Sequence, residues 1–475
     1  MNFIIFDIAL LIIFVACISI FLFIKRKNLK REGLLFLYKT KIGVKIIERI
    51  GKKYTKLLNV LSYISIILGF LLMIGVLYFF GKIIWIYIFQ AEIVKLVKVP
   101  PIMPLIPYLP QIFKLNFLPA FYFIYWIVII AIIAISHEFS HGIFAINKEV
   151  KIKSTGFGFF PFFLPVFLAA FVELDEKKME KKKILPQMAV LSAGTFANTL
   201  TAIFFFGILL LFFSLAFTPA GVMFDTYTYS AVSIAGISFV NGIGIENATY
   251  EQISGLISEA GFSEIEAGNT KYVITKSNFE EQKNNQGYLL LYDDAPAVRA
   301  NLSDIIVKIN GETVNSREKL GEEILKYSPG DKVIITTLEG DAFRDYEIIL
   351  GENPENEDKP YIGIGFIDRK SSGFLNKIAG VLTSFKKSNI YYKPNFAVSE
   401  FIYNLLWWLV LISFSVALVN MLPVGIFDGG RFFYLIMLAI TKSKDKAKKI
   451  FSAVTYFFLF LLLVLLVFWA INVFK

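Results

Sequence analysis

Long apolar runs are the feature that most constrains this chain. Several exceed the roughly 18 residues needed to cross the hydrocarbon core of a bilayer. No water satisfies backbone groups at that depth, so such runs fold as helices. A chain that is 56% hydrophobic, with a mean hydropathy of +0.63, is not a soluble globular protein. We expect six spans, at about residues 3–24, 57–80 with apolar residues continuing to 89, 118–146, 184–217, 401–422 and 450–474.

The charges are distributed as orientation signals around these runs. Residues 25–56 hold twelve lysines or arginines against two glutamates, and a second basic cluster lies at 442–449. Between Asp225 and Lys370, acidic residues outnumber basic ones about two to one. Basic loops stay in the cytoplasm, so we expect a multi-pass protein of the cell membrane with both basic segments inside and the acidic segment outside. The net charge of +10 therefore indicates contact with the lipid bilayer and not with nucleic acid.

The first apolar run has no basic residues before it and no cleavage site, so we interpret it as a retained signal-anchor span. Its Cys17 is the one cysteine of the chain, which excludes an intrachain disulfide and a cysteine-based metal site. Glycines and prolines interrupt the apolar segment 156–174, which is too short to cross twice and predicts a re-entrant membrane hairpin. Five parts follow: two spans with a basic cytoplasmic loop (1–90), a proline-rich external segment (91–117), a first membrane core (118–220), a soluble external α+β domain (221–375) and a second membrane core (376–475).

The two histidines of the chain occur in the string His137-Glu138-Phe139-Ser140-His141. On a helix, positions i and i+4 share one face, so both imidazoles can reach one metal ion. Glu138 could then act as general base on a water activated by that ion. The alternative is a pair of histidines that only hydrogen-bond neighbouring helices. Ionisable groups inside a span are costly and usually functional, which favours the metal site.

A catalytic zinc site usually has three protein ligands and an open position. The sequence offers no third histidine, so we expect a carboxylate at matching depth. Asp428 is the best candidate, because it lies in an apolar frame after Pro423 and before two glycines that interrupt the helix. Asp-Gly is also a common turn dipeptide, so a plain cytoplasmic turn remains an alternative. Glu173, beside a charged loop, is a weaker competitor.

Together these strings resemble the site-2 protease family of intramembrane zinc metalloproteases. The family has HExxH on one span and NxxPxxxxDG on a later one, and here the second string runs from Asn420 to Gly429. Residues 193–198 (Ala-Gly-Thr-Phe-Ala-Asn) resemble the family's small-residue segment, and 156–173 resemble its hairpin. The departures are Thr195, where the family often has proline, and Phe427, where it has leucine. The soluble part resembles a PDZ domain of the permuted bacterial type in residues 295–297, 302–311 and 329–331, while 221–284 would be an insertion or a partial second module.

The resemblance implies Zn²⁺ held by His137, His141 and Asp428, with Glu138 as the catalytic base. It further implies that Asn198 and Asn420 position the substrate, although either could instead form an interhelical hydrogen bond. The substrates would be transmembrane proteins or peptides, cut near the cytoplasmic side after their helix unwinds and pairs with the hairpin edge. The alternatives are a metal-dependent transporter and an inactive membrane scaffold with a PDZ-like domain. A scaffold has no need for Glu138, and we find no paired halves typical of a transporter.

Overall fold

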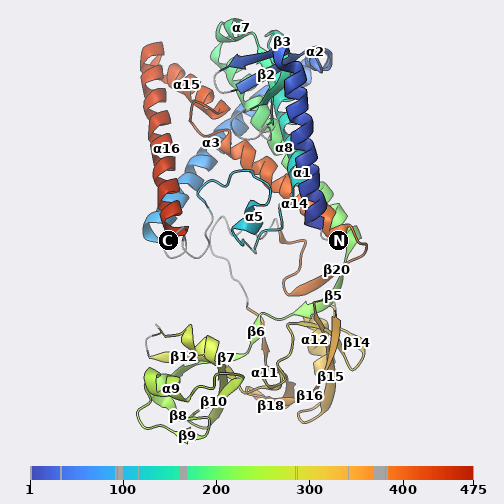
Figure 1. Cartoon of the computed structure of the whole chain (residues 1–475), viewed down its shortest axis with the longest axis vertical. Helices are drawn as coiled ribbons and strands as arrows, with labels where there is room; N and C mark the ends of the chain where they lie inside the picture. The colour runs from blue at the N-terminus through green and yellow to red at the C-terminus, as the bar shows by residue number, and fades with distance from the viewer. Residues whose placement is uncertain are drawn as a thin grey trace. The chain divides into compact units, whose positions relative to one another are not determined.

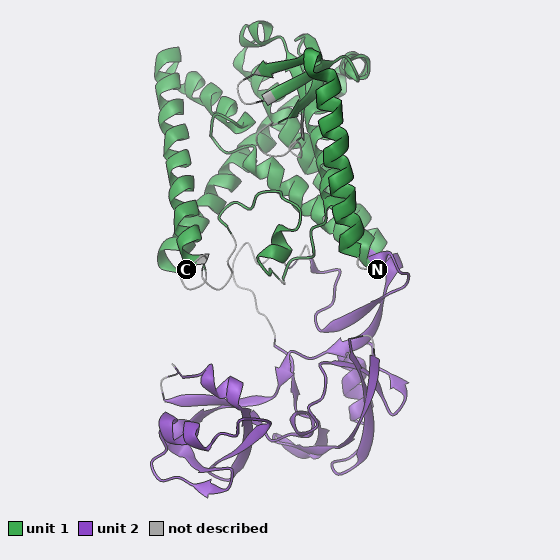
Figure 2. Cartoon of the chain, viewed as in Figure 1, with its two compact units in different colours: residues 1–212, 400–475 green, residues 213–399 purple. Residues whose placement is uncertain are grey.

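A computed structural model of the chain describes residues 3–32, 35–90, 94, 100–115, 117–159, 168–283, 285, 287–340, 342–367, 380 and 383–473. The chain forms two compact units (Figure 2). The first comprises Met1–Phe212 and Glu400–Lys475, and the second comprises Phe213–Ser399. The second unit therefore extends beyond both ends of the segment 221–375 that composition delimits. Its flanking strands are apolar and aromatic, and in the sequence they merge with the neighbouring spans.

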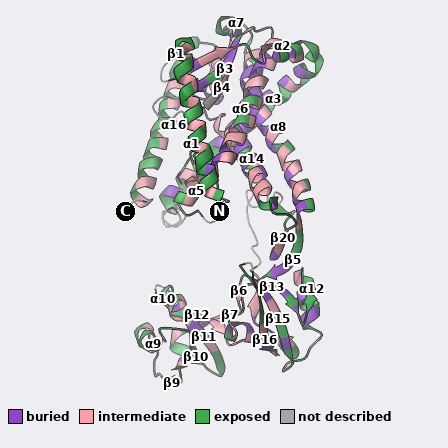
Figure 3. Ribbon diagram, turned by 45° about the vertical axis from the view of Figure 1, so that its right-hand side comes forward, coloured by how far each residue is buried: buried purple, intermediate pink, exposed green. Residues whose placement is uncertain are grey.

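Six helices of the first unit are long and apolar enough to cross a membrane, which confirms a multi-pass membrane protein. In the spans of α1 and α16, 6% of the most apolar window is buried, against 39% in α3, so most of their apolar side chains are exposed or only partly buried (Figure 3). A surface of this kind suits lipid and not water. The six are α1 (Phe3–Lys25), α3 (Thr55–Phe89), α6 (Phe123–Asn147), α8 (Ile184–Ala216), α14 (Ser399–Val419) and α16 (Lys444–Val473).

Helix α6 begins at Phe123, later than the expected residue 118. Asp7 of α1 fixes this start, since its buried carboxylate accepts hydrogen bonds from the N–H groups of Phe123 (2.7 Å) and Ile124 (3.0 Å). The Tyr108 hydroxyl donates a third hydrogen bond to the same carboxylate at 2.6 Å. An acid at a helix N-terminus satisfies otherwise unpaired N–H groups. The signal-anchor run therefore also caps the helix that carries the histidines.

A four-stranded antiparallel sheet lies at one end of the first unit (Figure 1), in the order β1-β2-β3-β4. Strands β3 and β4 form a hairpin where the sequence predicts one, although β3 starts earlier than expected. The hairpin tip, 160–167, lies outside the described residues, and the depth of the hairpin in a membrane stays a prediction. The strands are β1 (Leu29–Glu32), β2 (Leu35–Thr40), β3 (Ile152–Phe159) and β4 (Leu168–Leu174).

The basic segment 25–56, expected to be a cytoplasmic loop, is instead structured. Strands β1 and β2 form a hairpin, and β2 pairs with β3 so that Lys39 lies opposite Gly156. Helix α2 (Val44–Lys53) follows and packs against α6. The many lysines and arginines of this segment are typical of a loop, and the partner of β2 in the sheet, β3, lies more than a hundred residues away. One edge of β3 is consequently occupied, and the outer edge of the sheet on this side is β4.

Among its described residues, the second unit contains two large antiparallel sheets, one nested within the other, and two two-stranded ladders, β17-β18 and β19-β6. Strands β7 to β12, over residues 229–293, form a sheet in the order β7-β12-β11-β10-β8-β9 with its own apolar core. The second sheet, in the order β16-β15-β13-β5-β20 with β14 paired to β13, takes strands from both sides of this insertion. The segment 221–284 thus divides between the start of the outer sheet and most of an inserted module, which ends with β12 at Asp293. Helix α12, which begins at Arg317, and the hairpin of β15 and β16 belong to the part of the chain that follows the insertion.

The bounds in the second unit are β5 (Phe217–Met223), β6 (Thr226–Tyr227), β7 (Tyr229–Ser233), β8 (Ile237–Val240), β9 (Ile243–Gly244), α9 (Tyr250–Leu256), β10 (Phe262–Ala267), β11 (Thr270–Thr275), α10 (Lys276–Glu280), β12 (Tyr288–Asp293), α11 (Pro296–Arg299), β13 (Ile305–Ile309), β14 (Glu312–Thr313), α12 (Arg317–Ile324), β15 (Lys332–Glu339), β16 (Ala342–Ile349), β17 (Gly351–Asn353), β18 (Asn356–Tyr361), β19 (Ile364–Gly365) and β20 (Ile390–Pro394). The described residues of the first unit also form the shorter helices α5 (Leu109–Ile112), α7 (Glu176–Glu180) and α15 (Asp428–Thr441).

Candidate metal centre

Helix α6 presents both histidines on one face, as their spacing predicts. The Nε2 atoms of His137 and His141 lie 3.0 Å apart, and each residue is 9% exposed. Two imidazoles seldom face each other at this distance in an apolar interior unless something between them is shared. The two rings therefore form one side of a binding site.

Asp428 completes this group from the start of α15. Its Oδ2 lies 3.2 Å from both Nε2 atoms, and the three residues form a cluster able to hold a metal ion. Glu173, the competing carboxylate, is not part of the cluster. It lies on β4, where its Oε2 accepts a hydrogen bond from Ser154 at 2.5 Å and pairs with Lys39 at 3.0 Å. This hydrogen bond and the Lys39 ammonium hold the pKa of the Glu173 carboxyl below its usual value despite its partial burial.

The donor set fits zinc. Ligand atoms at about 2.0–2.1 Å from a tetrahedral ion lie about 3.3 Å from one another. The three separations here are 3.0, 3.2 and 3.2 Å. Two imidazoles and one carboxylate form a common catalytic zinc set that leaves one position open. His137, His141 and Asp428 would hold the ion.

The outer nitrogens of both rings are fixed by hydrogen bonds. The Nδ1–H of His141 donates to the carbonyl oxygen of Val190 at 2.7 Å, which leaves the Nε2 lone pair directed at the site. Nδ1 of His137 lies 3.1 Å from the side-chain amide of Asn198, a fully buried residue. The amide oxygen of Asn198 has no partner among the described residues. Rotating the amide by half a turn lets that oxygen accept from His137 Nδ1–H, which satisfies the oxygen and frees Nε2 for a metal.

Asn198 therefore lies against His137, one of the three residues able to hold a metal ion, whereas the resemblance suggests a contact with substrate. The signal in the sequence was an amide side chain within a strongly apolar span, which marks a partner without identifying it. The Val190 carbonyl could not have been found from the sequence, because any residue offers one.

Glu138 contacts the four-stranded sheet as well as lying beside the histidine pair in the sequence. Its Oε2 accepts a hydrogen bond from the Val172 N–H of β4 at 2.9 Å. Backbone groups alternate along a strand, so the N–H groups of Val172 and Ala170 face outward, and that of Phe171 faces β3. The proposed base thus lies directly at the outer edge of β4.

Helix α8 approaches the two rings through Gly194. A methyl group at this position would lie 2.4 Å from His141 Nε2 and 2.6 Å from His137 Nε2. Only glycine leaves room for the rings together with an ion. The small-residue string 193–198 marks this close approach in the sequence.

Asn420 contributes through its backbone. Its carbonyl oxygen accepts from the Gly429 N–H at 2.7 Å, which closes the turn between α14 and α15. Methyl groups at Gly429 and Gly430 would lie 2.3 Å from the backbones of Met421 and Val424. The two glycines permit this tight turn, and the turn directs Asp428 toward the histidines.

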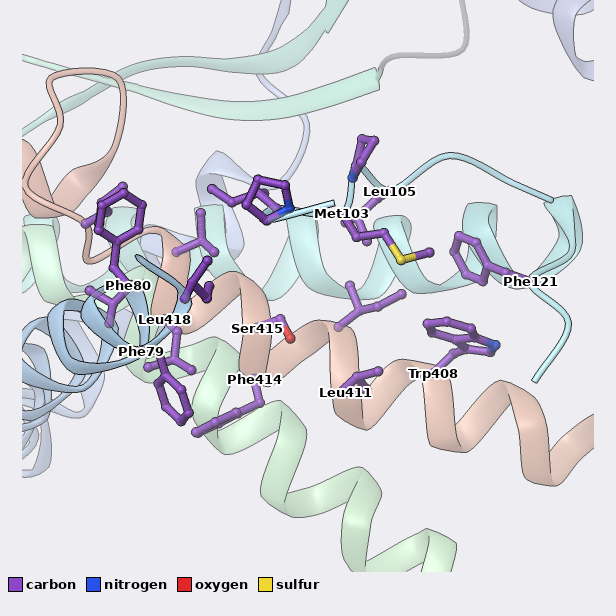
Figure 4. Close-up of a pocket in the computed structure, with 18 residues that line it drawn as sticks. Phe79, Phe80, Met103, Leu105, Phe121, Trp408, Leu411, Phe414, Ser415 and Leu418 are labelled. Atoms are coloured by element: carbon purple, nitrogen blue, oxygen red, sulfur yellow. The ribbon is translucent and has the colours of Figure 1, made fainter. Parts of the chain in front are cut away.

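An apolar cavity of about 470 Å³ lies between α3, α14 and the proline-rich segment (Figure 4). It extends from Trp408 of α14 to Leu422, which lies three residues after that helix and two residues beyond Asn420, and Ser415 supplies a hydroxyl in an otherwise nearly apolar wall. Phe79, Met103 and Phe414 are among the side chains that line it (Figure 4). The cavity suits apolar groups.

Comparison with known proteins identifies one family. The model of a family described as peptidase family M50 matches residues 125–464, which include both histidines and the aspartate. No curated protein matches the chain. Ten chains of solved structures match, among them the PDZ domain of an SdrC-like protein from Listeria monocytogenes. That match has 27% sequence identity and a TM-score of 0.14, and it covers 16% of this chain and 79% of the other.

Proposed function

Because the chain belongs to peptidase family M50, the site-2 protease family, we propose that it is an intramembrane zinc metalloprotease. It hydrolyses peptide bonds within or near the transmembrane segments of membrane-protein substrates. The observation that carries this proposal is the convergence of His137, His141 and Asp428 beside Glu138, in a unit with six candidate spans.

The residues divide the chemical work. His137, His141 and Asp428 hold the ion, and zinc, when bound, supplies Lewis acidity toward a water and the scissile carbonyl. Glu138 takes the proton of the attacking water and passes it to the leaving amine. Asn198 and the Val190 carbonyl keep the two rings in the tautomers that direct Nε2 inward.

The substrate binds in an extended form along β4. A transmembrane helix hides its amides in its own hydrogen bonds, so it must unwind before hydrolysis, and the exposed backbone then needs new partners. The outward N–H of Ala170 supplies such a partner by β-augmentation, beside Val172, whose N–H already donates to Glu138. This edge is supported by the β2–β3 pairing, which occupies the other side of the hairpin, and by the Val172–Glu138 hydrogen bond. The cavity along α14 accommodates apolar side chains of the substrate.

The outer domain binds an extended peptide end. A groove of about 250 Å³ lies between α12 and the segment 360–366, and Leu320, Ile324 and Ile362 line it. The carbonyl oxygens of Gly363 and Gly365 accept from Thr228 and Asp225, so the backbone of Ile364 between them points the other way. An apolar groove beside an open strand is the geometry of PDZ-type peptide capture. The charge distribution predicts that this domain lies outside the cell. There it selects substrates by the peptide end that they present.

A cleavage assay tests the proposal. Purified protein, reconstituted with zinc and a transmembrane peptide, should carry about one zinc per chain and cut the peptide. His137→Ala and Asp428→Asn should lose most of the zinc. Glu138→Gln should keep the zinc and lose cleavage, because the base and the ligands are separate. Near-normal proteolysis by Glu138→Gln would remove the base assignment, and zinc without any cleavage by the unchanged protein would favour a scaffold or a transporter.

A further inference from the structure

We propose that the outward face of α2 is a docking surface for anionic lipid headgroups, and that this contact sets the position of the catalytic helix. The face belongs to the basic segment that joins the first two spans. The proposal concerns regulation of the site described above, so its activity readout rests on the proposed protease function. Its binding readout does not.

Helix α2 has two chemically different faces. Lys45, Arg49, Lys52 and Lys53 are all exposed on one of them. The opposite face carries Ile47, which is fully buried, and Gly51. Such segregation at helical spacing is the pattern of an interfacial helix, rich in cations on one side.

The outward face also exposes apolar side chains. Ile46, in the same stripe as Arg49 and Lys53, is 57% exposed, and Ile42, just before the helix, is 76% exposed. Bulky aliphatic groups among cations are poorly suited to water or to nucleic acid. They suit the boundary between headgroups and acyl chains. A single residue, Tyr54, separates α2 from span α3, so the helix lies next to the bilayer by chain connectivity.

The cations of α2 are not neutralised by acidic side chains of the described residues, although the Lys53 ammonium lies over the Tyr54 ring, 5.2 Å from its centroid. The described ion pairs near this end of the unit join Lys39 to Glu173, Lys182 to Glu149 and Arg431 to Glu176. In the described part of the chain, none involves a cation of α2. Cations near an anionic membrane surface each strengthen attraction by a factor of about five.

The inner face of α2 touches the catalytic helix at three close contacts. A methyl at Gly51 would lie 2.8 Å from Ile146 of α6, and a methyl at Gly142 of α6 would lie 2.9 Å from Ile47. A methyl at Gly43, just before α2, would lie 2.7 Å from the ring of Phe139, the residue after Glu138. Packed helices at this spacing move together, so a force on α2 from lipid reaches the HExxH turn.

Lipid-resolved quenching tests the docking surface. The full chain, with Cys17→Ser and Ile46→Cys carrying a fluorescent label, is reconstituted in vesicles of phosphatidylcholine with a third of the lipid replaced by phosphatidylglycerol. Brominating one lipid class at a time shows which class lies next to the label. Brominated phosphatidylglycerol should quench more than its mole fraction allows, and replacing the four α2 cations by glutamine should abolish the excess. Quenching in proportion to mole fraction in the unsubstituted helix would refute the docking surface.

Cleavage in the same vesicles tests the coupling. Phosphatidylglycerol should raise the rate by about fivefold or more relative to pure phosphatidylcholine, and the α2 variant should lose this dependence with its zinc intact. The matched control replaces Lys444, Lys446, Lys448 and Lys449 of α16, with the same loss of charge, and should keep it. Equal loss in both variants, or no lipid dependence in the unsubstituted protein, would overturn the inference. Absence of cleavage in every vesicle would instead count against the protease function, and the quenching result would still decide the lipid contact.

Discussion

The glycine that faces the histidine rings gives the sharpest prediction. In Gly194→Ala the new methyl would lie 2.4–2.6 Å from ring atoms of His137 and His141, where ordinary contacts are about 3.4–4 Å. The rings must retreat by about 1 Å, which exceeds the roughly 0.2 Å tolerance of zinc–ligand distances. Hydrogen bonds to Asn198 and Val190 oppose that movement. We expect zinc affinity to fall by about 10–100-fold, or about 1.4–2.8 kcal/mol, and cleavage by about 100-fold.

Gly207→Ala is the control, because it lies on the same helix with nothing within 4 Å of the new methyl. Replacing a glycine inside a helix by alanine otherwise stabilises by about 0.5–1 kcal/mol. Both variants should therefore fold, and they should differ in zinc affinity, measured by competition with a chelator. If Gly194→Ala matched Gly207→Ala in zinc affinity and in cleavage rate, the two histidine rings would not be confined as the structure describes.

Three further predictions follow from the same geometry. Asn198→Ala should weaken zinc binding about 10–100-fold with little change in KM, because it frees the His137 ring without touching substrate. A change confined to KM would return Asn198 to a substrate-positioning role. Ala170→Pro should keep zinc and lose cleavage, because it removes an outward N–H of β4. Phe171→Pro should lose zinc as well, because it breaks the β3–β4 ladder. Equal effects of both variants would leave β4 without a substrate role. With Cys17 removed, an impermeant thiol reagent should label Gly340→Cys on intact cells and Lys446→Cys only after the cells are opened, and the reverse pattern would invert the predicted topology.

The metal cluster could be predicted because its signals are local. The spacing of His137 and His141 places both on one helix face whatever the rest of the fold does. Asp428 followed by exclusion, since few other ionisable groups lie in so apolar a frame. The structure brings the three together, and the six expected spans agree closely with the six long helices.

The surroundings of the metal cluster depend on contacts between segments that lie far apart in the chain, and the sequence gives little indication of these contacts. Strand β2 reads as part of a basic loop, and its partner β3 lies beyond two spans. Asp7 was one acid in an apolar run, and nothing near it in the sequence indicated that it caps α6. In both cases the interaction satisfies backbone groups, which every residue possesses, so side-chain chemistry gave no hint of the partner.

The glycines around the site indicate close packing as well as backbone freedom. The glycines after Asp428 suggest local freedom of the backbone, but both serve a tight approach to the turn at 421–425. Gly194 in the same way admits the histidine rings, and Gly51 admits Ile146 of α6. In each case a methyl group would collide with a catalytic element or with the backbone that supports it. A rigid site of this kind holds its ligands in place without a large polar network, which suits an interior where polar groups are costly. Glycines that flank an intramembrane acid or lie in a small-residue string therefore identify the helices that surround the metal, even where no polar residue does.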